Sequence, residues 1–174
     1  IDGETRYFDN EVGIGFESVV TMEARRFKYL RGLALYLPAV LKSILSSLHP
    51  AQSVIEFENG AGPERIENKI LMLDICNGGR AGGAFLVAPE AQSDDGMFDI
   101  CMLPEIPRLR MLALLPHFLK GTHTSQPEVS IFRTPRISIT SPDPLAAHAD
   151  GELLCDAAHH IECEIIPQKL RVIC

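Results

Sequence analysis

The stretch "HADGELL", residues 148–154, places two carboxylates on either side of a glycine, directly after a strand-like apolar segment. If Gly151 lets the chain turn sharply between two strands, Asp150 and Glu152 project together from the end of a sheet. One carboxylate could then accept a proton from a hydroxyl while the other meets a metal ion or water. The tripeptide also occurs at residues 2–4, so it does not decide alone. On chemistry alone, a polar hairpin turn is the favoured interpretation.

A second acidic group lies in "QSDDGMFDI", which contains Asp94, Asp95 and Asp99. Hard cations such as Mg²⁺ and Ca²⁺ prefer oxygen ligands, and a tight turn can supply a carboxylate together with main-chain carbonyl oxygens. The loop is too short and irregular for an EF-hand. A solvated acidic turn is the more common explanation of this pattern.

Two further segments contain ligand-binding residue types, but a structural interpretation is favoured for both. The glycine-rich "NGGRAGGAF" could cradle phosphate, yet no Gly-Lys-Ser/Thr follows and a strand follows instead of a helix, so a β-turn is favoured. The segment "CDAAHHIEC" offers Cys155, His159, His160 and Cys163, but adjacent strand residues point to opposite faces and the spacing fits no standard zinc module. No Gly-x-Ser-x-Gly motif supports acyl transfer.

Short strands are the main elements available to position these groups. Strands are predicted at residues 4–9 and in "QSVIEFENG", "RIENKILMLDIC", "GAFLVAP", "MFDICMLP", "RISIT", "IECEI" and the closing "KLRVI". Many short strands separated by turn signals, with few helices, predict a mainly β (α+β) fold. We expect a two-layer antiparallel β-sandwich with helical insertions, forming a single domain over residues 1–174.

Helical periodicity occurs in two places. It runs from Thr21 to the "HP" at residues 49–50, with Pro38 placed to start a second helix or to kink one. It returns over about residues 107–120 and ends at a lysine followed by Gly121, a common helix stop.

Composition excludes several classes of protein. Sixteen basic and twenty-three acidic residues give a net charge of −7, and no Lys/Arg run could neutralise a row of phosphates, so nucleic acid is not an expected partner. The sequence contains neither an apolar run long enough to span a membrane nor a signal-peptide pattern, which predicts a cytoplasmic protein. Five widely spaced cysteines suit reduced thiols.

Four stretches occur in an order that resembles the C-terminal half of the diacylglycerol kinase catalytic superfamily, which includes bacterial lipid kinases and sphingosine and ceramide kinases. They are "FDNEVGIGFESVV", "NGGRAGGAFLVAPEAQSDDGMFDI", "KGTH" and "ISITSPDPLAAHADGELL", and together they extend over most of the chain. The second stretch is the most specific, because it combines an asparagine and paired glycines with Ala-Pro-x-Ala and Asp-Gly.

This resemblance implies a two-domain enzyme that uses ATP and Mg²⁺ to phosphorylate a lipid hydroxyl. In the family, an N-terminal domain binds ATP through a Gly-Gly-Asp-Gly-Thr loop, and the C-terminal β-sandwich contributes the lipid pocket. That loop does not occur here, and the chain does not begin with methionine. We therefore expect these residues to be the C-terminal domain alone, inactive without the N-terminal nucleotide-binding domain.

The resemblance also assigns roles by position. It makes Asp150 the carboxylate that orients the acceptor hydroxyl and takes its proton, and it makes Glu152 the group that positions this carboxylate or the Mg²⁺-bound phosphates. Gly151 and Glu152 would face the nucleotide. A structural divalent ion, as in bacterial members, would use the Asp95 carboxylate with main-chain oxygens of Gln92 and Met97.

A lipid pocket is less transferable from the family. Phe8, Phe16, Val20 and the helix carrying Leu33 to Leu45 could line it, but core packing explains each of them equally well and is favoured.

The sequence thus predicts the lipid-substrate side of a kinase, with diacylglycerol-like substrates ahead of sphingoid bases. Expected partners are the lipid, the N-terminal domain and, transiently and peripherally, a membrane; a homodimer is compatible with the sequence. One alternative is an NAD kinase-like phosphotransferase that acts on a ribose hydroxyl. The other is a non-catalytic lipid-binding or regulatory module.

Overall fold

A computed structural model describes residues 1–27, 29–58, 64–82 and 84–170 of the chain. Strands predominate, as the sequence predicts. In chain order the elements are β1 (Glu11–Gly15), α1 (Phe16–Ala24), α2 (Leu33–Ser46), β2 (Ala51–Glu58), β3 (Arg65–Cys76), β4 (Arg80–Ala81), β5 (Phe85–Leu86), β6 (Phe98–Pro104), α3 (Arg108–Lys120), the 3-10 helix η1 (His123–Ser125), β7 (Ser130–Thr134), β8 (Arg136–Ala149) and β9 (Glu152–Glu164).

In the main antiparallel sheet, β1 and β2 lie end to end between the long strands β3 and β8. Residues 65–70 of β3 pair with β2 and residues 72–76 pair with β1, and β8 also pairs with both. β1 and β2 pair with the same edge of β3. The opposite edge is occupied by β6, since Ile70 pairs with Ala51 of β2 on one side and with Pro104 of β6 on the other. The segment that contains α1 and α2 is therefore an insertion into one interrupted strand.

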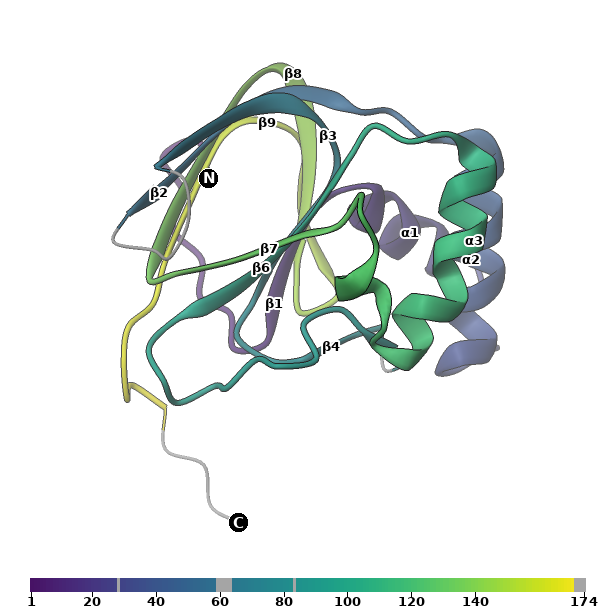
Figure 1. Cartoon of the computed structure of the whole chain (residues 1–174), viewed down its shortest axis with the longest axis horizontal. Helices are drawn as coiled ribbons and strands as arrows, with labels where there is room; N and C mark the ends of the chain where they lie inside the picture. The colour runs from purple at the N-terminus through teal and green to yellow at the C-terminus, as the bar shows by residue number, and fades with distance from the viewer. Residues whose placement is uncertain (28, 59–63, 83, 171–174) are drawn as a thin grey trace.

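The sheet curls around a core of aliphatic side chains (Figure 1). Five different strands contribute fully buried isoleucines to it, namely Ile55, Ile75, Ile100, Ile137 and Ile161. Because alternate strand residues face opposite sides, these side chains can meet only if the sheet folds over on itself. The predicted antiparallel sandwich is confirmed, and its two layers are halves of one hydrogen-bonded sheet.

Three helices cover part of the other face of the sheet, over β3 and β6, and form a second core there (Figure 1). Val20, Ile44 and Leu114 from the three helices pack there with Leu103 of β6. The α3 helix has the predicted extent and ends at Gly121 in the left-handed conformation. The long predicted helical segment is instead two helices, which begin at Phe16 and Leu33, with Pro38 inside α2.

One predicted strand is wrong and two are wrong in part. Residues 4–9 form no strand, and the N–H group of Asp9, the last of them, donates to the Asp150 carboxylate and not to a neighbouring strand. In "GAFLVAP" the strand covers only β5. In "KLRVI", residues 169–170 lie outside any strand, and the rest falls outside the described residues.

Within the described ranges no helix has the length and apolar character needed to cross a bilayer. Four cysteines there are free thiols, in agreement with the expectation: Cys76, Cys101, Cys155 and Cys163.

His123 predicts a pH dependence of stability. It is fully buried, stacks on Phe118 with ring centroids 4.1 Å apart, and its Nε2–H donates to the Val87 carbonyl at 2.8 Å. Burial lowers its pKa below the usual 6.5 and outweighs the hydrogen bond to the Val87 carbonyl, which acts to raise the pKa. The unfolded chain therefore binds more protons, and stability that is full above about pH 6.5 is lost as the pH falls.

We expect the free energy of unfolding, measured in urea, to fall below pH 6.5 by up to about 1.4 kcal/mol per pH unit from this group. His148 contributes in the same direction, because burial lowers its pKa too. The difference between the wild type and His123→Gln isolates the His123 share. Equal slopes in the two proteins would contradict this assignment.

Candidate functional site

Asp150 and Gly151 form a two-residue hairpin turn between β8 and β9. Their φ angles are 49° and 80°, and the flanking Ala149 and Glu152 pair across the turn. Positive φ at both central positions is the turn that Asp-Gly favours between antiparallel strands. The predicted sharp turn is confirmed, and the exposed Glu152 follows it directly.

The second Asp-Gly-Glu, at residues 2–4, has a separate and structural role. Asp2 and Gly3 also have positive φ, but the Asp2 carboxylate accepts the backbone N–H groups of His159 and His160. It ties the start of the chain to β9.

The Asp150 carboxylate is held by three consecutive backbone N–H groups. Oδ2 accepts from Asp9 at 3.0 Å, and Oδ1 accepts from Asn10 at 3.0 Å and from Glu11 at 2.9 Å. Burial acts to raise the pKa of Asp150, but these hydrogen bonds outweigh it and lower the pKa below the usual value. The side chain is therefore a fixed, ionised carboxylate at neutral pH.

The glycine-rich segment supports this site from behind. Asn77 and Gly78 donate backbone N–H groups to the Asn10 carbonyl, and the Asn10 side-chain amide donates to the Arg80 carbonyl at 3.0 Å. A side chain at Gly78 would clash with Asn10, since a Cβ there would lie 2.2 Å from Oδ1. The segment is a structural turn, as favoured from the sequence, and it holds the backbone that binds Asp150.

A cavity of about 530 Å³ extends from this turn into the helix-side core. Its apolar walls come mainly from the helices and the β4–β5 region: Phe16, Val20, Val40, Met72, Phe85, Val87, Met111, Leu115 and Phe118. Asp150 and Gly151 line its polar end. An elongated apolar molecule could therefore present a polar group to the fixed carboxylate.

The sequence predicted part of this lining. Phe16 and Val20 are lining residues, whereas Phe8 stacks on Phe98, with centroids 5.7 Å apart, in the other core. In α2 the lining residues are Tyr36 and Val40, while Leu33, Leu41 and Leu45 are exposed.

Sequence analysis missed an acidic group at the polar end of the cavity, formed by Glu11, Glu17, Asp74 and His148. We call these four residues the carboxylate–histidine cluster. Gly13 in β1 pairs with Asp74 of β3 on one side and with His148 of β8 on the other. The sequence did contain a signal for this cluster, because Glu11 and Asp74 are single charged residues within the apolar stretches "NEVGIG" and "ILMLDIC".

Burial dominates the electrostatics of the cluster. Burial, followed by the charges of Glu17 and Asp150, raises the pKa of Glu11 to about 9. Burial and then the charge of Glu17 raise the pKa of Asp74 well above its usual value. Like-charged carboxyl groups in such a site must hold protons or bind a cation.

The predicted metal ligands of the acidic turn lie together in the structure. The Asp95 carboxylate accepts the Met97 N–H at 2.9 Å and is ion-paired with Arg133, and the Asp95 N–H donates to the Gln92 carbonyl at 3.4 Å. A cation at Asp95 would therefore replace Arg133 as its partner. The metal site stays a prediction.

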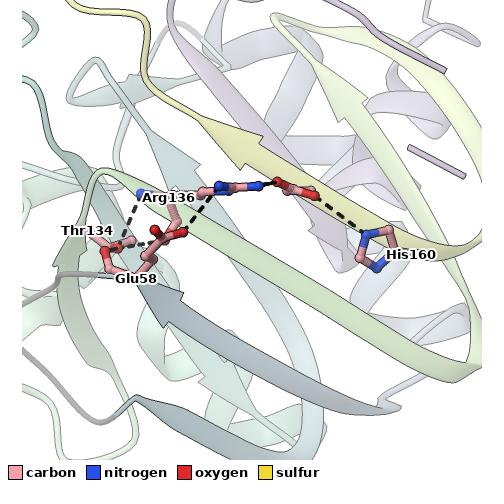
Figure 2. Close-up of polar contacts among 5 residues, drawn as sticks. Glu58, Thr134, Arg136 and His160 are labelled. Atoms are coloured by element: carbon pink, nitrogen blue, oxygen red, sulfur yellow. Dashed lines mark hydrogen bonds and ion pairs between the residues drawn. The ribbon is translucent and has the colours of Figure 1, made fainter. Parts of the chain in front are cut away.

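The histidine pair on β9 has separate partners. His159 Nδ1 donates to the Ser141 carbonyl at 3.0 Å. His160 belongs to a surface network in which Arg136 pairs with Glu58 and Glu162, and Glu162 lies 3.9 Å from His160 (Figure 2). The two imidazoles thus make different contacts and do not face one ion.

Comparisons with known proteins find relatives of this chain that are named as lipid kinases. The family described as the YegS C-terminal NAD kinase beta sandwich-like domain matches residues 10–174. A diacylglycerol kinase of Mycobacterium tuberculosis (strain H37Rv) is 30% identical over 172 residues, which cover 99% of this chain and 53% of that protein. A probable YegS-like lipid kinase of Stenotrophomonas maltophilia (strain K279a) is 32% identical over 176 residues, covering 98% of this chain and 54% of that protein.

The fold also matches a solved structure. The crystal structure of a diacylglycerol kinase from Bacillus anthracis str. Sterne superimposes with a TM-score of 0.53 at 15% identity, covering 90% of this chain and 47% of that one. At this identity the match concerns the fold alone. This chain spans about half the length of the curated relatives that it matches.

Proposed function

The chain belongs to the YegS C-terminal NAD kinase β-sandwich-like domain family, and on this premise we propose that it is the lipid-binding side of an ATP-dependent lipid kinase. The observation that supports this most is the apolar cavity of about 530 Å³ that ends at the ionised Asp150. The second half of the active site would be a nucleotide-binding domain, without which these residues are inactive.

Phosphoryl transfer requires mainly positioning and charge neutralisation. The hydroxyl oxygen of the lipid forms a bond to the γ-phosphorus of ATP, ADP leaves, and the hydroxyl proton passes to Asp150. ATP supplies the phosphoryl group when bound, and Mg²⁺ neutralises its charge. Glu152, exposed beside Gly151, would lie on the nucleotide side and would position the Asp150 carboxylate or the metal-bound phosphates.

The walls of the cavity favour a lipid over a nucleotide. Methyl, methylene and aromatic groups line the inner part of the space, which suits acyl chains, whereas its polar end is mainly acidic and suits phosphates poorly. We place diacylglycerol-like lipids ahead of sphingoid bases. The enzyme would be cytoplasmic and touch membranes transiently through exposed apolar side chains, such as Tyr29, Leu30 and Leu33, which lie close in sequence to the cavity-lining Gly32.

The decisive experiment is transfer of labelled phosphate from ATP to diacylglycerol, to sphingosine and to NAD by the natural polypeptide that contains these residues. We expect diacylglycerol phosphorylation to dominate. Phosphorylation of NAD would support the alternative enzyme. Binding of lipid without transfer to any acceptor would support a non-catalytic module.

Leu115→Trp should shift the chain-length preference. Leu115 is buried on α3 and lines the cavity, so an indole there shortens the space for an acyl chain. We expect KM for long-chain diacylglycerol to rise about tenfold or more, because a pocket that loses a few methylene contacts loses roughly 1–3 kcal/mol. A short-chain substrate should keep its kcat and KM.

The matched control is Leu109→Trp, which changes an exposed leucine of the same helix away from the cavity. Its kinetics should equal those of the wild type for both substrates. If Leu115→Trp changed KM equally for long-chain and short-chain substrates, the cavity would not be the site that binds the acyl chain.

A further inference from the structure

The carboxylate–histidine cluster has no role in the phosphoryl transfer described above. It is distinct from the acidic turn at residues 92–97, which lies elsewhere in the chain and pairs with Arg133. We propose that Glu11, Glu17 and His148, with Asp74 behind them, form a site for a divalent transition-metal ion, with Mn²⁺ as the probe ion.

The first argument is geometric. One ligand atom from each of Glu11, Glu17 and His148 lies within 4.8 Å of the other two. An ion with bonds of about 2.1 Å joins ligands up to about 4.2 Å apart, so small side-chain adjustments complete the set. The ligands come from β1, from the first turn of α1 and from β8, so a bound ion would clamp three elements together.

Gly13 explains why the groups can approach each other. A Cβ on Gly13 would lie 2.4 Å from His148 Nε2 and 3.0 Å from Glu17 Oε2. Because Gly13 has no side chain, these two ligand atoms lie in the space that a side chain there would occupy. Any other residue at this position of β1 would push the imidazole and the carboxylate apart.

The second argument is that the polar atoms lack partners. Only 1% of His148 is exposed, yet neither of its ring nitrogens has a hydrogen-bond partner in the part of the chain that the structure describes. Buried polar groups are nearly always satisfied, so unpaired groups aimed into one space indicate a ligand there.

Charge points to a cation as that ligand. Among the described residues, the ion pairs of the chain involve none of the three carboxyl groups of the cluster. Neither ring nitrogen of His148 is engaged by another group of the described chain, so a ring nitrogen is free to coordinate a metal. The cluster also lines the cavity, so an ion has a path of entry.

The mixture of ligands selects the class of metal. An imidazole with two carboxylates suits Mn²⁺, Fe²⁺ or Zn²⁺ better than Mg²⁺ or Ca²⁺, which prefer oxygen ligands alone. The Glu11 backbone N–H donates to Asp150 Oδ1 at 2.9 Å, so an ion on the Glu11 side chain would also fix the backbone that holds Asp150. Glu11 would then link the metal to the proposed catalytic turn.

Mn²⁺ binding to the natural polypeptide, stripped with chelator and free of nucleotide, tests the site. The loss of the free Mn²⁺ electron paramagnetic resonance signal gives the affinity and stoichiometry. We expect Glu17→Gln, which keeps the size of the side chain, to weaken binding by about tenfold or more, and His148→Asn to do the same. Each variant is made in an Asp95→Asn background, which removes the carboxylate of the acidic turn and any ion held there, so the remaining Mn²⁺ binding belongs to the cluster.

Thermal unfolding provides a second readout that does not depend on kinase activity. At about 100 times the Kd, Mn²⁺ should raise the midpoint by roughly 5–10 °C in the Asp95→Asn protein, but not in the double variant Asp95→Asn, Glu17→Gln. Equal concentrations of Mg²⁺ should have a much smaller effect. Absence of Mn²⁺ binding to the Asp95→Asn protein, or binding that survives Glu17→Gln in that background, would each overturn the proposal. Failure of the kinase assay would leave these results unaffected.

Discussion

Asp150→Asn should lower kcat for lipid phosphorylation by about 10²–10⁴-fold in the natural polypeptide, with little change in KM for ATP. The substitution keeps the shape of the side chain but removes the group that orients the acceptor hydroxyl and takes its proton. The low pKa of Asp150 makes the carboxylate available at neutral pH, and the three backbone N–H groups fix its direction. Loss of the charge should therefore affect the chemical step most.

The same N–H groups create a structural effect that must be separated from the catalytic one. The carbonyl oxygen of an asparagine can still accept hydrogen bonds from the backbone. Its NH₂ group, however, faces a backbone N–H, and neither of these two donors can accept a hydrogen bond from the other. We expect a loss of about 1–3 kcal/mol in the free energy of unfolding, measured in urea. Most of the chain therefore remains folded, and the loss of kcat exceeds any loss of folded protein.

Glu152→Gln is the matched control on the other side of Gly151. Glu152 is exposed and makes no hydrogen bond to residues 9–11, so this change should leave stability unaltered. If Glu152 positions the nucleotide phosphates, the variant should raise KM for ATP by a larger factor than it lowers kcat. An Asp150→Asn enzyme with full activity would reduce the turn to a structural hairpin.

The hairpin was predictable because its determinants are local. An Asp-Gly pair between two strand-like stretches specifies a turn with positive φ at both positions, and Asp150 and Gly151 have it. The α3 helix was predictable for the same reason, since Lys120 and Gly121 supply its last turn and its stop. In both cases neighbouring residues contain the whole signal.

The carboxylate–histidine cluster was not predictable because it depends on strand register. Gly13 lies between Asp74 and His148 only after β1 has paired with β3 and β8, which are distant in the sequence. Periodicity reports which face a residue occupies, but it does not name the strand beside it. The same limit hid the fact that β1 and β2 are one interrupted strand, with α1 and α2 inserted.

Gly15→Ala should destabilise the protein by about 3 kcal/mol or more. Gly15 ends β1 and precedes α1 with φ 80° and ψ −122°, a conformation that costs other residues roughly 1–3 kcal/mol. A Cβ there would also lie 2.7 Å from the Leu71 carbonyl oxygen, which belongs to the backbone of β3 and cannot rotate away. Relief of that contact would require β1 to separate from β3 or α1 to shift, which would displace Glu17 from the cavity.

Gly96→Ala separates these two causes. Gly96 also has a positive φ, of 74°, but no atom lies within 4 Å of a Cβ placed on it. We therefore expect a loss of only about 1–2 kcal/mol there, from the backbone conformation alone. Urea unfolding of the two variants beside the wild type gives the difference directly. If Gly15→Ala were no more costly than Gly96→Ala, the junction between β1 and α1 would be free to relax, and Gly15 would not be what holds Glu17 against β1.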